Sequence, residues 1–181
     1  MAAIGVFCAS SRSIDQRYLD LAHEAGLELA RRGHTLVSGG GCVSMMGALA
    51  DGARAGGAYT FGVIPELLVA REVADTAADE LVVTPDMVQR KLIMMDKADA
   101  FLTLPGGLGT LDELLEVWTT ATLGLHAKPC VVLNAGGFYA GFLDWLRGLV
   151  EPGFVRADAI ELLKVVDSVP TAFDTIESAL G

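Results

Sequence analysis

A glycine-rich segment that ends in two acids has the clearest potential for chemistry in this sequence. Residues 104–113 read LPGGLGTLDE and follow a nearly continuous apolar run. Glycines let a ligand approach the backbone closely, and the unpaired N–H groups that begin a helix attract anions. The segment therefore predicts a phosphate-binding loop between a buried strand, at 99–104, and a helix.

Glu113 is the candidate catalytic carboxylate of this segment. The apolar positions of the predicted helix recur at helical spacing: Leu111, Leu114, Leu115 and Trp118. This stripe would face a sheet, so we expect Glu113 to point away from the core, at the rim where α/β sheets bind ligands. An alternative stays open, because residues 110–113 also spell a capping box, in which the glutamate only closes the helix end.

Two adjacent cations, Arg90 and Lys91, lie in a predicted helix at 85–97. Lys91 falls in the middle of a broad apolar arc, and Arg90 lies at its edge, so both side chains would project to the same border. The arc consists of Met87, Val88, Leu92, Met94, Met95 and Ala98. A lysine there costs several kcal/mol unless its charge is paired or its amine reaches water. The pair predicts an anion site, and the alternative is a snorkelling lysine in an ion pair.

Loops that follow other predicted strands supply further candidates. Ser10 lies in the loop after the first strand, although a serine there is more often a helix cap. Gly40 and Gly41 belong to a second glycine cluster, which has neither the lysine of a P-loop nor a G-x-G-x-x-G pattern. Met45 and Met46 follow it and are expected in the core, with a base pocket as the alternative. We expect these loops, with Pro65 and Asn134, to meet at one edge.

Strand and helix patterns alternate along the whole chain. The predicted strands span residues 4–8, 35–37, 59–64, 81–83, 99–104, 129–133 and 163–167, and the last predicted helix spans 170–180. This alternation predicts an α/β fold with a doubly wound parallel sheet, Rossmann-like. A chain of 181 residues is expected to form a single domain over 1–181. Trp145 lies off the apolar face of its helix, which indicates a partner surface.

Composition excludes several classes of function. The chain is 52% hydrophobic with a formal net charge of −10, which argues against a nucleic-acid surface. No apolar run approaches the roughly 18 residues that span a bilayer, so we expect a cytoplasmic protein without membrane contact. The three cysteines and three histidines are unclustered, which predicts no metal site, no disulfide, structural histidines and buried thiols.

The chain resembles the Lonely Guy (LOG) family of cytokinin riboside 5′-monophosphate phosphoribohydrolases. The pattern P-G-G-x-G-T-x-x-E is complete at 105–113, and the Arg-Lys pair at 90–91 precedes it at the family interval. The resemblance extends through 6–8, the triple glycine at 39–41, 62–65 and 124–129. It implies hydrolysis of the N-glycosidic bond of N6-substituted adenosine monophosphates without a metal or cofactor. It also implies a homodimer.

The family's site residues map onto this chain by motif. The resemblance implies that Arg90 and Glu113 form the catalytic pair. It implies substrate contacts for Glu72, Lys91, Gly107, Leu108, Gly109, Thr110, Leu111, Asp112 and Thr119. From the sequence alone, Glu72 is an ordinary surface acid.

Departures from the family pattern leave the base preference open. Leu108 replaces a frequent tyrosine, and Ser38 and Ser44 begin segments in which many relatives have tyrosine and glycine. A noncatalytic nucleotide-binding or carrier protein is the main alternative function. Lysine decarboxylation, an older label in this family, would require a cofactor such as pyridoxal phosphate and a Schiff-base lysine.

Overall fold

Seven parallel strands form one sheet at the centre of the computed structural model, which describes residues 1–69, 71 and 73–181. The strands are β1 (Ala3–Phe7), β2 (Thr35–Ser38), β3 (Thr60–Pro65), β4 (Glu80–Thr84), β5 (Ala100–Thr103), β6 (Cys130–Leu133) and β7 (Leu163–Val166). Their order is β4-β3-β2-β1-β5-β6-β7, and every neighbouring pair is parallel. The chain winds outward from β1 in one direction and from β5 in the other. The predicted doubly wound α/β sheet is therefore confirmed.

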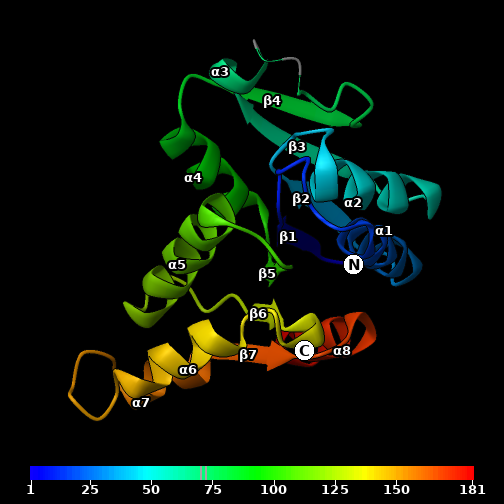
Figure 1. The fold of residues 1–181 in the computed structure, drawn as a ribbon. Helices are drawn as coiled ribbons and strands as arrows, with labels where there is room; N and C mark the ends of the chain where they lie inside the picture. Colours follow the sequence, from blue (N-terminus) through cyan, green and yellow to red (C-terminus); the bar gives the residue numbers. More distant parts are fainter. Residues whose placement is uncertain (70, 72) are drawn as a thin grey trace.

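Helices cover both faces of the sheet. They are α1 (Gln16–Arg31), α2 (Ser44–Ala55), α3 (Glu66–Val69), α4 (Met87–Lys97), α5 (Leu108–Thr122), α6 (Ala140–Gly148), α7 (Ala157–Leu162) and α8 (Val169–Leu180). A short 3-10 helix, η1 (Ala135–Gly137), precedes α6. Figure 1 shows α1, α2 and α8 on one side of the sheet and α4, α5 and α6 on the other.

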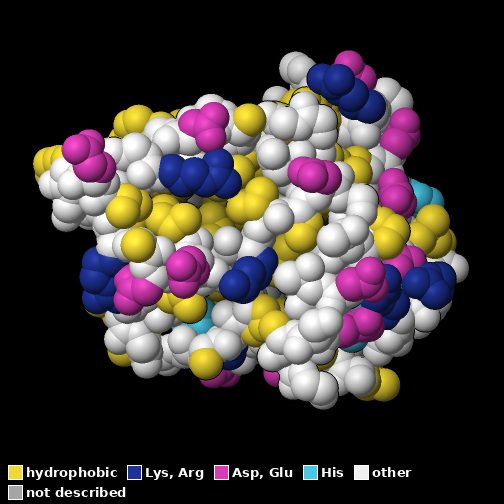
Figure 2. Space-filling model, turned by 90° about the horizontal axis from the view of Figure 1, so that it is seen from below, with side chains coloured by type: hydrophobic (Ala, Val, Ile, Leu, Met, Phe, Trp, Pro, Cys, Tyr) yellow, Lys and Arg dark blue, Asp and Glu magenta, His cyan; other side chains and the backbone are white. Residues whose placement is uncertain are grey.

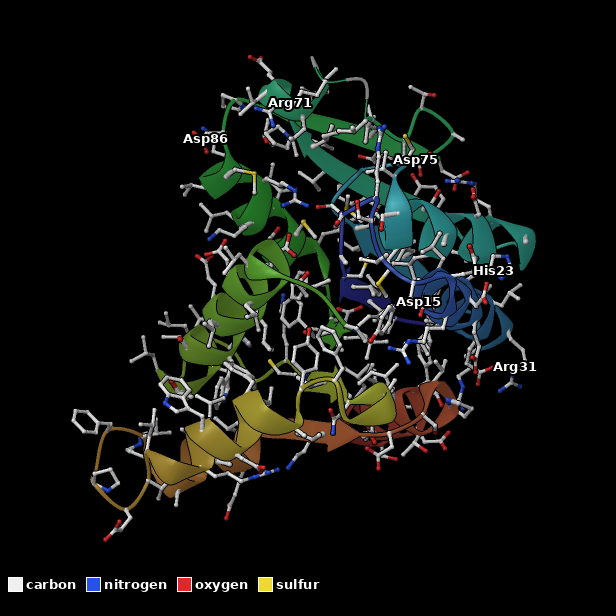
Figure 3. The ribbon with its side chains drawn as sticks, viewed as in Figure 1. Asp15, His23, Arg31, Arg71, Asp75 and Asp86 are labelled. Carbon is white, nitrogen blue, oxygen red and sulfur yellow. The ribbon has the colours of Figure 1, made fainter. Side chains whose placement is uncertain are left out.

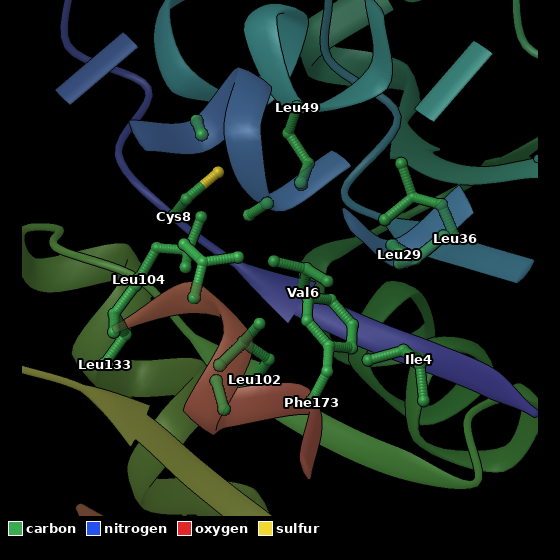
Figure 4. Close-up of a cluster of buried hydrophobic side chains, with 14 of the residues drawn as sticks. Ile4, Val6, Cys8, Leu29, Leu36, Leu49, Leu102, Leu104, Leu133 and Phe173 are labelled. Carbon is green, nitrogen blue, oxygen red and sulfur yellow. The ribbon is translucent and has the colours of Figure 1, made fainter. Parts of the chain in front are cut away.

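Each face of the sheet carries its own apolar core. On the first face, side chains of β1, β5 and β6 pack against α1, α2 and α8, and Figure 4 shows Val6, Leu49 and Phe173 among them. On the second face, Phe101 stacks on Phe7, and both pack in one cluster with side chains of α4, α5 and α6. Parallel strands are covered on both faces in this way, which explains their nearly continuous apolar sequences.

The boundaries of most elements agree with the sequence within one or two residues. The helix predicted from residue 85 begins at Met87, because the Asp86 side chain accepts a hydrogen bond from the Gln89 N–H at 2.8 Å and caps it (Figure 3). The last helix begins at Val169, where Ser168 acts in the same way.

Two helices expose apolar residues. Leu115 of α5 was placed on the sheet-facing stripe, and this prediction was wrong: it is 39% exposed and lines a cavity beside Phe154 instead. Val88 and Leu92, on the apolar arc of α4, are more than half exposed. Trp145 of α6 is 62% exposed, as predicted. Figure 2 shows apolar groups in the left half of its face, the half that carries α6 and α7 in Figure 1.

The three cysteines are unpaired, and they differ in burial. Cys8 and Cys130 are buried as predicted, but Cys42 is exposed, because it lies in the turn before α2 and outside both cores. In the described part of the chain, no helix has both the length and the apolar character needed to cross a membrane.

Candidate active site

A cavity of about 380 Å³ opens at the carboxyl ends of β1 and β5. These strands are neighbours at the point where the winding of the sheet reverses, which is where open α/β sheets bind ligands. The polar side of the lining comes from Ser10, Ser11, Arg90, Gly107, Gly109, Thr110 and Glu113. The predicted convergence of the loops after β1, β2 and β5 is thus observed.

The glycine-rich loop places the beginning of α5 at this cavity. The helix starts at Leu108, and Gly107 precedes it without any side-chain cap. The first backbone N–H groups of a helix have no partner within the helix, so those of Leu108, Gly109 and Thr110 are free to meet an anion. Thr110 lies inside the helix, two residues after its first. The alternative of a capping box that starts at Thr110 is therefore wrong.

Glu113 lines the cavity at the predicted rim of the sheet, but it is buried there and forms an ion pair. One carboxylate oxygen accepts a hydrogen bond from Nη1 of Arg90 at 2.9 Å, and both residues are 7% exposed. Nε of Arg90 donates to the Val63 carbonyl at 3.0 Å. The helical wheel of α5 did not predict this burial, because α4 packs beside α5 and brings Arg90 against the side of α5 that carries Glu113.

The electrostatics of Glu113 follow from this burial. Loss of solvation raises the pKa of its carboxyl above the ordinary glutamate value, and the charge of Arg90 opposes the increase. A carboxyl with a raised pKa is a stronger base than a solvated one when it is ionised. The neighbouring Cys8 thiol has a raised pKa, chiefly through burial, and stays protonated. Glu113 is thus the basic group of the described cavity lining.

The second glycine cluster accommodates Arg90 and packs the sheet edge. A Cβ at Gly39 would lie 3.0 Å from the guanidinium carbon and still closer to Nη2, so a side chain there would displace Arg90. Gly40 has φ +67° and packs against Val63 and Ile64 rather than lining the cavity. Gly41 does line the cavity, next to Met46.

Several predicted contact residues lie outside this cavity. Lys91 also faces α5, where it forms ion pairs with Asp112 at 3.0 Å and Glu116 at 2.5 Å. This matches the alternative of a paired lysine, and of the two cations only Arg90 lines the cavity. Leu111 is partly buried against the second core. Thr119 lines a different cavity, beside Trp118 and Phe154.

Two further positions predicted at the site, Glu72 and Asn134, are not among the described residues that line the cavity. Glu72 lies outside the described residues. The Asn134 side chain accepts a hydrogen bond from the Tyr139 N–H at 2.8 Å and does not line the cavity.

Sequence reasoning missed most of the apolar lining. These residues are Val6, Ile64, Leu68, Val73 and Met87, together with Met46, for which a base pocket was only the alternative. Met45 is fully buried in the core, as expected. The helical spacing of α2 was a usable signal for Met46. Adjacent side chains in a helix point about 100° apart, so Met45 and Met46 cannot both point directly at the sheet. Leu68 and Val73 lie in a segment without clean periodicity, so no pattern could have placed them.

Comparison with known proteins decides the family. The family model described as possible lysine decarboxylase matches residues 46–176. A cytokinin riboside 5′-monophosphate phosphoribohydrolase of Mycobacterium tuberculosis is 52% identical over 169 residues, which is 93% of this chain and 90% of the relative. The chain belongs to the LOG family. A LOG enzyme of Oryza sativa is 43% identical over 96% of this chain and 70% of its own length.

Solved structures with the same fold share much less sequence with this LOG family chain. The molybdenum cofactor carrier protein of Chlamydomonas reinhardtii aligns with a TM-score of 0.73 and 21% identity, over 99% of this chain and 98% of that one. The molybdenum cofactor binding protein of Rippkaea orientalis aligns with a TM-score of 0.75 at 21% identity, again over 99% and 98%. At these identities the likeness supports the fold alone.

Proposed function

We propose that this protein hydrolyses the N-glycosidic bond of adenosine 5′-monophosphates, including N6-substituted ones, and releases the free base and ribose 5-phosphate. The observation that carries the proposal is the buried pair of Glu113 and Arg90, which lies in one cavity with the free amides that begin α5. The names of relatives that are 52% and 43% identical support the same reaction.

The reaction assigns a separate task to each part of the cavity. The 5′-phosphate would bind the N–H groups of Leu108, Gly109 and Thr110, with Ser10 on the facing loop. Water attacks C1′ while the bond from C1′ to the base nitrogen breaks. The base leaves with the electron pair and takes up a proton from solvent at that nitrogen, which gives the free base. Positive charge that develops on the ribose is stabilised by the Glu113 carboxylate, which also accepts a proton from the attacking water.

Arg90 holds the carboxylate in place and keeps it ionised. A guanidinium keeps its proton at neutral pH, so it is a poor acid for the leaving base. Its hydrogen bonds to Glu113 and to the Val63 carbonyl fix the direction of the carboxylate. We therefore propose that Arg90 acts by orientation and charge.

The apolar lining favours a base with an apolar substituent. Met46, Leu68, Val73 and Met87 line the cavity along with its polar groups. A prenyl-like group on N6 would bury apolar area there, at about 25 cal/mol per Å². We expect N6-alkylated monophosphates to have a lower KM than AMP.

Glu113→Gln is the direct test of the proposed reaction. We expect the variant to release no base from a panel of nucleoside monophosphates, while binding of AMP by calorimetry persists. Glu116→Gln is the matched control, because it makes the same change one turn along the same helix, outside the cavity lining. Full activity of Glu113→Gln would refute the proposal. Binding of AMP by the native protein with no ribose 5-phosphate formed would instead indicate a carrier.

Lysine decarboxylation is disfavoured by the side chains of the cavity. Among its described lining residues there is no lysine to form a Schiff base. Lys91, the nearest along the chain to Arg90, is held by Asp112 and Glu116. We expect no carbon dioxide from lysine in the presence of pyridoxal phosphate, and measurable release would contradict this.

We also propose that two copies associate through α4 and α5. Val88 and Leu92 of α4 and Leu115 of α5 are exposed apolar side chains there. The family resemblance places Thr119 at the substrate, but in its own chain Thr119 lines a different cavity. A second copy on this surface would explain the difference, because the Thr119 of one chain could then lie near the substrate of the other. Light scattering should give the mass of a dimer for the native protein and of a monomer for Leu92→Glu. Leu27→Glu, on α1 at the other side of the sheet, is the control and should remain dimeric.

A further inference from the structure

The carbonyl of Leu104, directly before the glycine-rich loop, accepts a hydrogen bond from a side chain on another element. The Tyr139 hydroxyl donates to it at 2.8 Å, and this tyrosine is 2% exposed. Leu104 is itself fully buried. Leaving a buried carbonyl without its donor lowers the stability of the fold by about 1–3 kcal/mol, so we expect the hydrogen bond from Tyr139 to Leu104 to be maintained.

The turn at Leu104 and Pro105 is thus fixed from two directions. On the side of β1, the Leu104 N–H donates to the Phe7 carbonyl at 2.9 Å, and the Ala9 N–H donates to the Pro105 carbonyl at 3.3 Å. On the side of α6, the contact is Tyr139. The bond from Tyr139 therefore sets the orientation of the peptide unit that leads into Gly106 and the start of α5.

Tyr139 is itself held rigidly. Its backbone N–H donates to the Asn134 side chain at 2.8 Å, and its ring packs edge-on against Phe138 and at a tilt against Phe142. Burial raises the pKa of its phenol, with an opposing contribution from the Gly106 backbone amide, so the hydroxyl keeps its proton and remains a donor.

We propose that Tyr139 is a positioning residue for the phosphate of the substrate. Its hydroxyl orients the Leu104–Pro105 turn so that the amides of Leu108 to Thr110 converge on the anion, although it does not line the cavity itself. The inference rests on the proposed function, because it assumes that the loop binds a 5′-phosphate. It predicts an effect on phosphorylated ligands that is larger than any effect on the corresponding unphosphorylated ones.

Tyr139→Phe removes the hydroxyl and keeps the ring, and it is the test of this inference. The matched control is Tyr59→Phe, which removes a hydroxyl that bonds to Glu80 at the far, amino end of β3. Calorimetry with ribose 5-phosphate should show affinity at least about tenfold weaker in Tyr139→Phe than in the control. The KM for AMP should rise by a similar factor while kcat changes less, and the affinity for adenosine should be unchanged.

The outcomes separate this inference from the proposed function. Equal affinity of both variants for ribose 5-phosphate would overturn the role of Tyr139, as would an equal loss of affinity for AMP and adenosine. Weakened phosphate binding by a protein that releases no base would support Tyr139 and refute the hydrolase. Asn134→Ser is a second variant that leaves the phenol in place and loosens its anchor. A smaller loss in the same direction is expected, and no loss would count against the proposal.

Discussion

Replacing Gly39 with alanine is expected to disable the site through a single methyl group. The backbone tolerates the change, because Gly39 is not among the glycines with positive φ. The added Cβ would stand 3.0 Å from the guanidinium carbon of Arg90 and nearer to Nη2, whereas ordinary contacts begin at about 3.4 Å. Arg90 must therefore move by more than an ångström, and this displacement would break its bonds to Glu113 and Val63.

The size of the effect follows from that displacement. A shift of about 1 Å in a catalytic group costs about 10²-fold in rate, which corresponds to about 2.7 kcal/mol of transition-state stabilisation. We expect kcat/KM for AMP to fall by about this factor in Gly39→Ala. Breaking the buried ion pair would also lower the free energy of unfolding by up to about 3–5 kcal/mol.

Base release from AMP and urea unfolding measure these two quantities. Gly141→Ala is the control, because its Cβ would meet nothing within 4 Å and its helix, α6, does not line the cavity. It should match the native protein in both assays. If Gly39→Ala were folded and as active as the control, the packing of Arg90 against Gly39 would have no part in catalysis, and the reasoning would be refuted.

Three further outcomes are expected. Burial raises the pKa of Glu113, and its ionised form is the active one, so kcat/KM should fall on the acid side with an apparent pKa above 4.5. Arg90→Gln should move this acid limb to higher pH, because it removes the opposing charge. An acid limb at or below 4.5 would contradict the assignment. Hydrogen bonds from neighbouring arginines lower the pKa of Glu28 to about 2, so its contribution to stability is full above 4.5 and is lost as the pH falls toward 2. Glu28→Gln should cost about 1 kcal/mol in urea unfolding at pH 7 and much less at pH 2, and a cost that did not vary with pH would argue against the ion pairs. In Gly106→Ala, the new Cβ would lie 2.5 Å from that of Thr110, so the loop should shift and the KM for AMP should rise about tenfold; an unchanged KM would exclude the loop from phosphate binding.

The sequence contained enough information to predict the sheet and the edge where the loops meet. Short apolar runs alternate with helical periodicity, and loops that leave parallel strands at their carboxyl ends must share an edge. That reasoning brought Ser10, Gly107 and Glu113 to one place before any contact was known.

What the sequence could not supply was the packing of one helix against another. Arg90 and Lys91 are adjacent, so they point about 100° apart, and only the position of α5 decides which of them meets Glu113. The burial of Glu113 has the same origin, because a helical wheel describes one helix and not its neighbour. The role of Gly39 depends on a contact across 51 residues, which no local pattern encodes.

The hydrogen bond by which Asp86 begins α4 has a consequence for how this chain can vary in length. The first turn of the helix is anchored there, and Arg90 follows after a fixed number of residues. Each residue added or removed between them rotates the remainder by about 100°, so a deletion would present Lys91 to Glu113 and an insertion would present Gln89. Length changes should therefore be tolerated ahead of Asp86 but not within 86–90, where the number of residues decides which side chain faces Glu113.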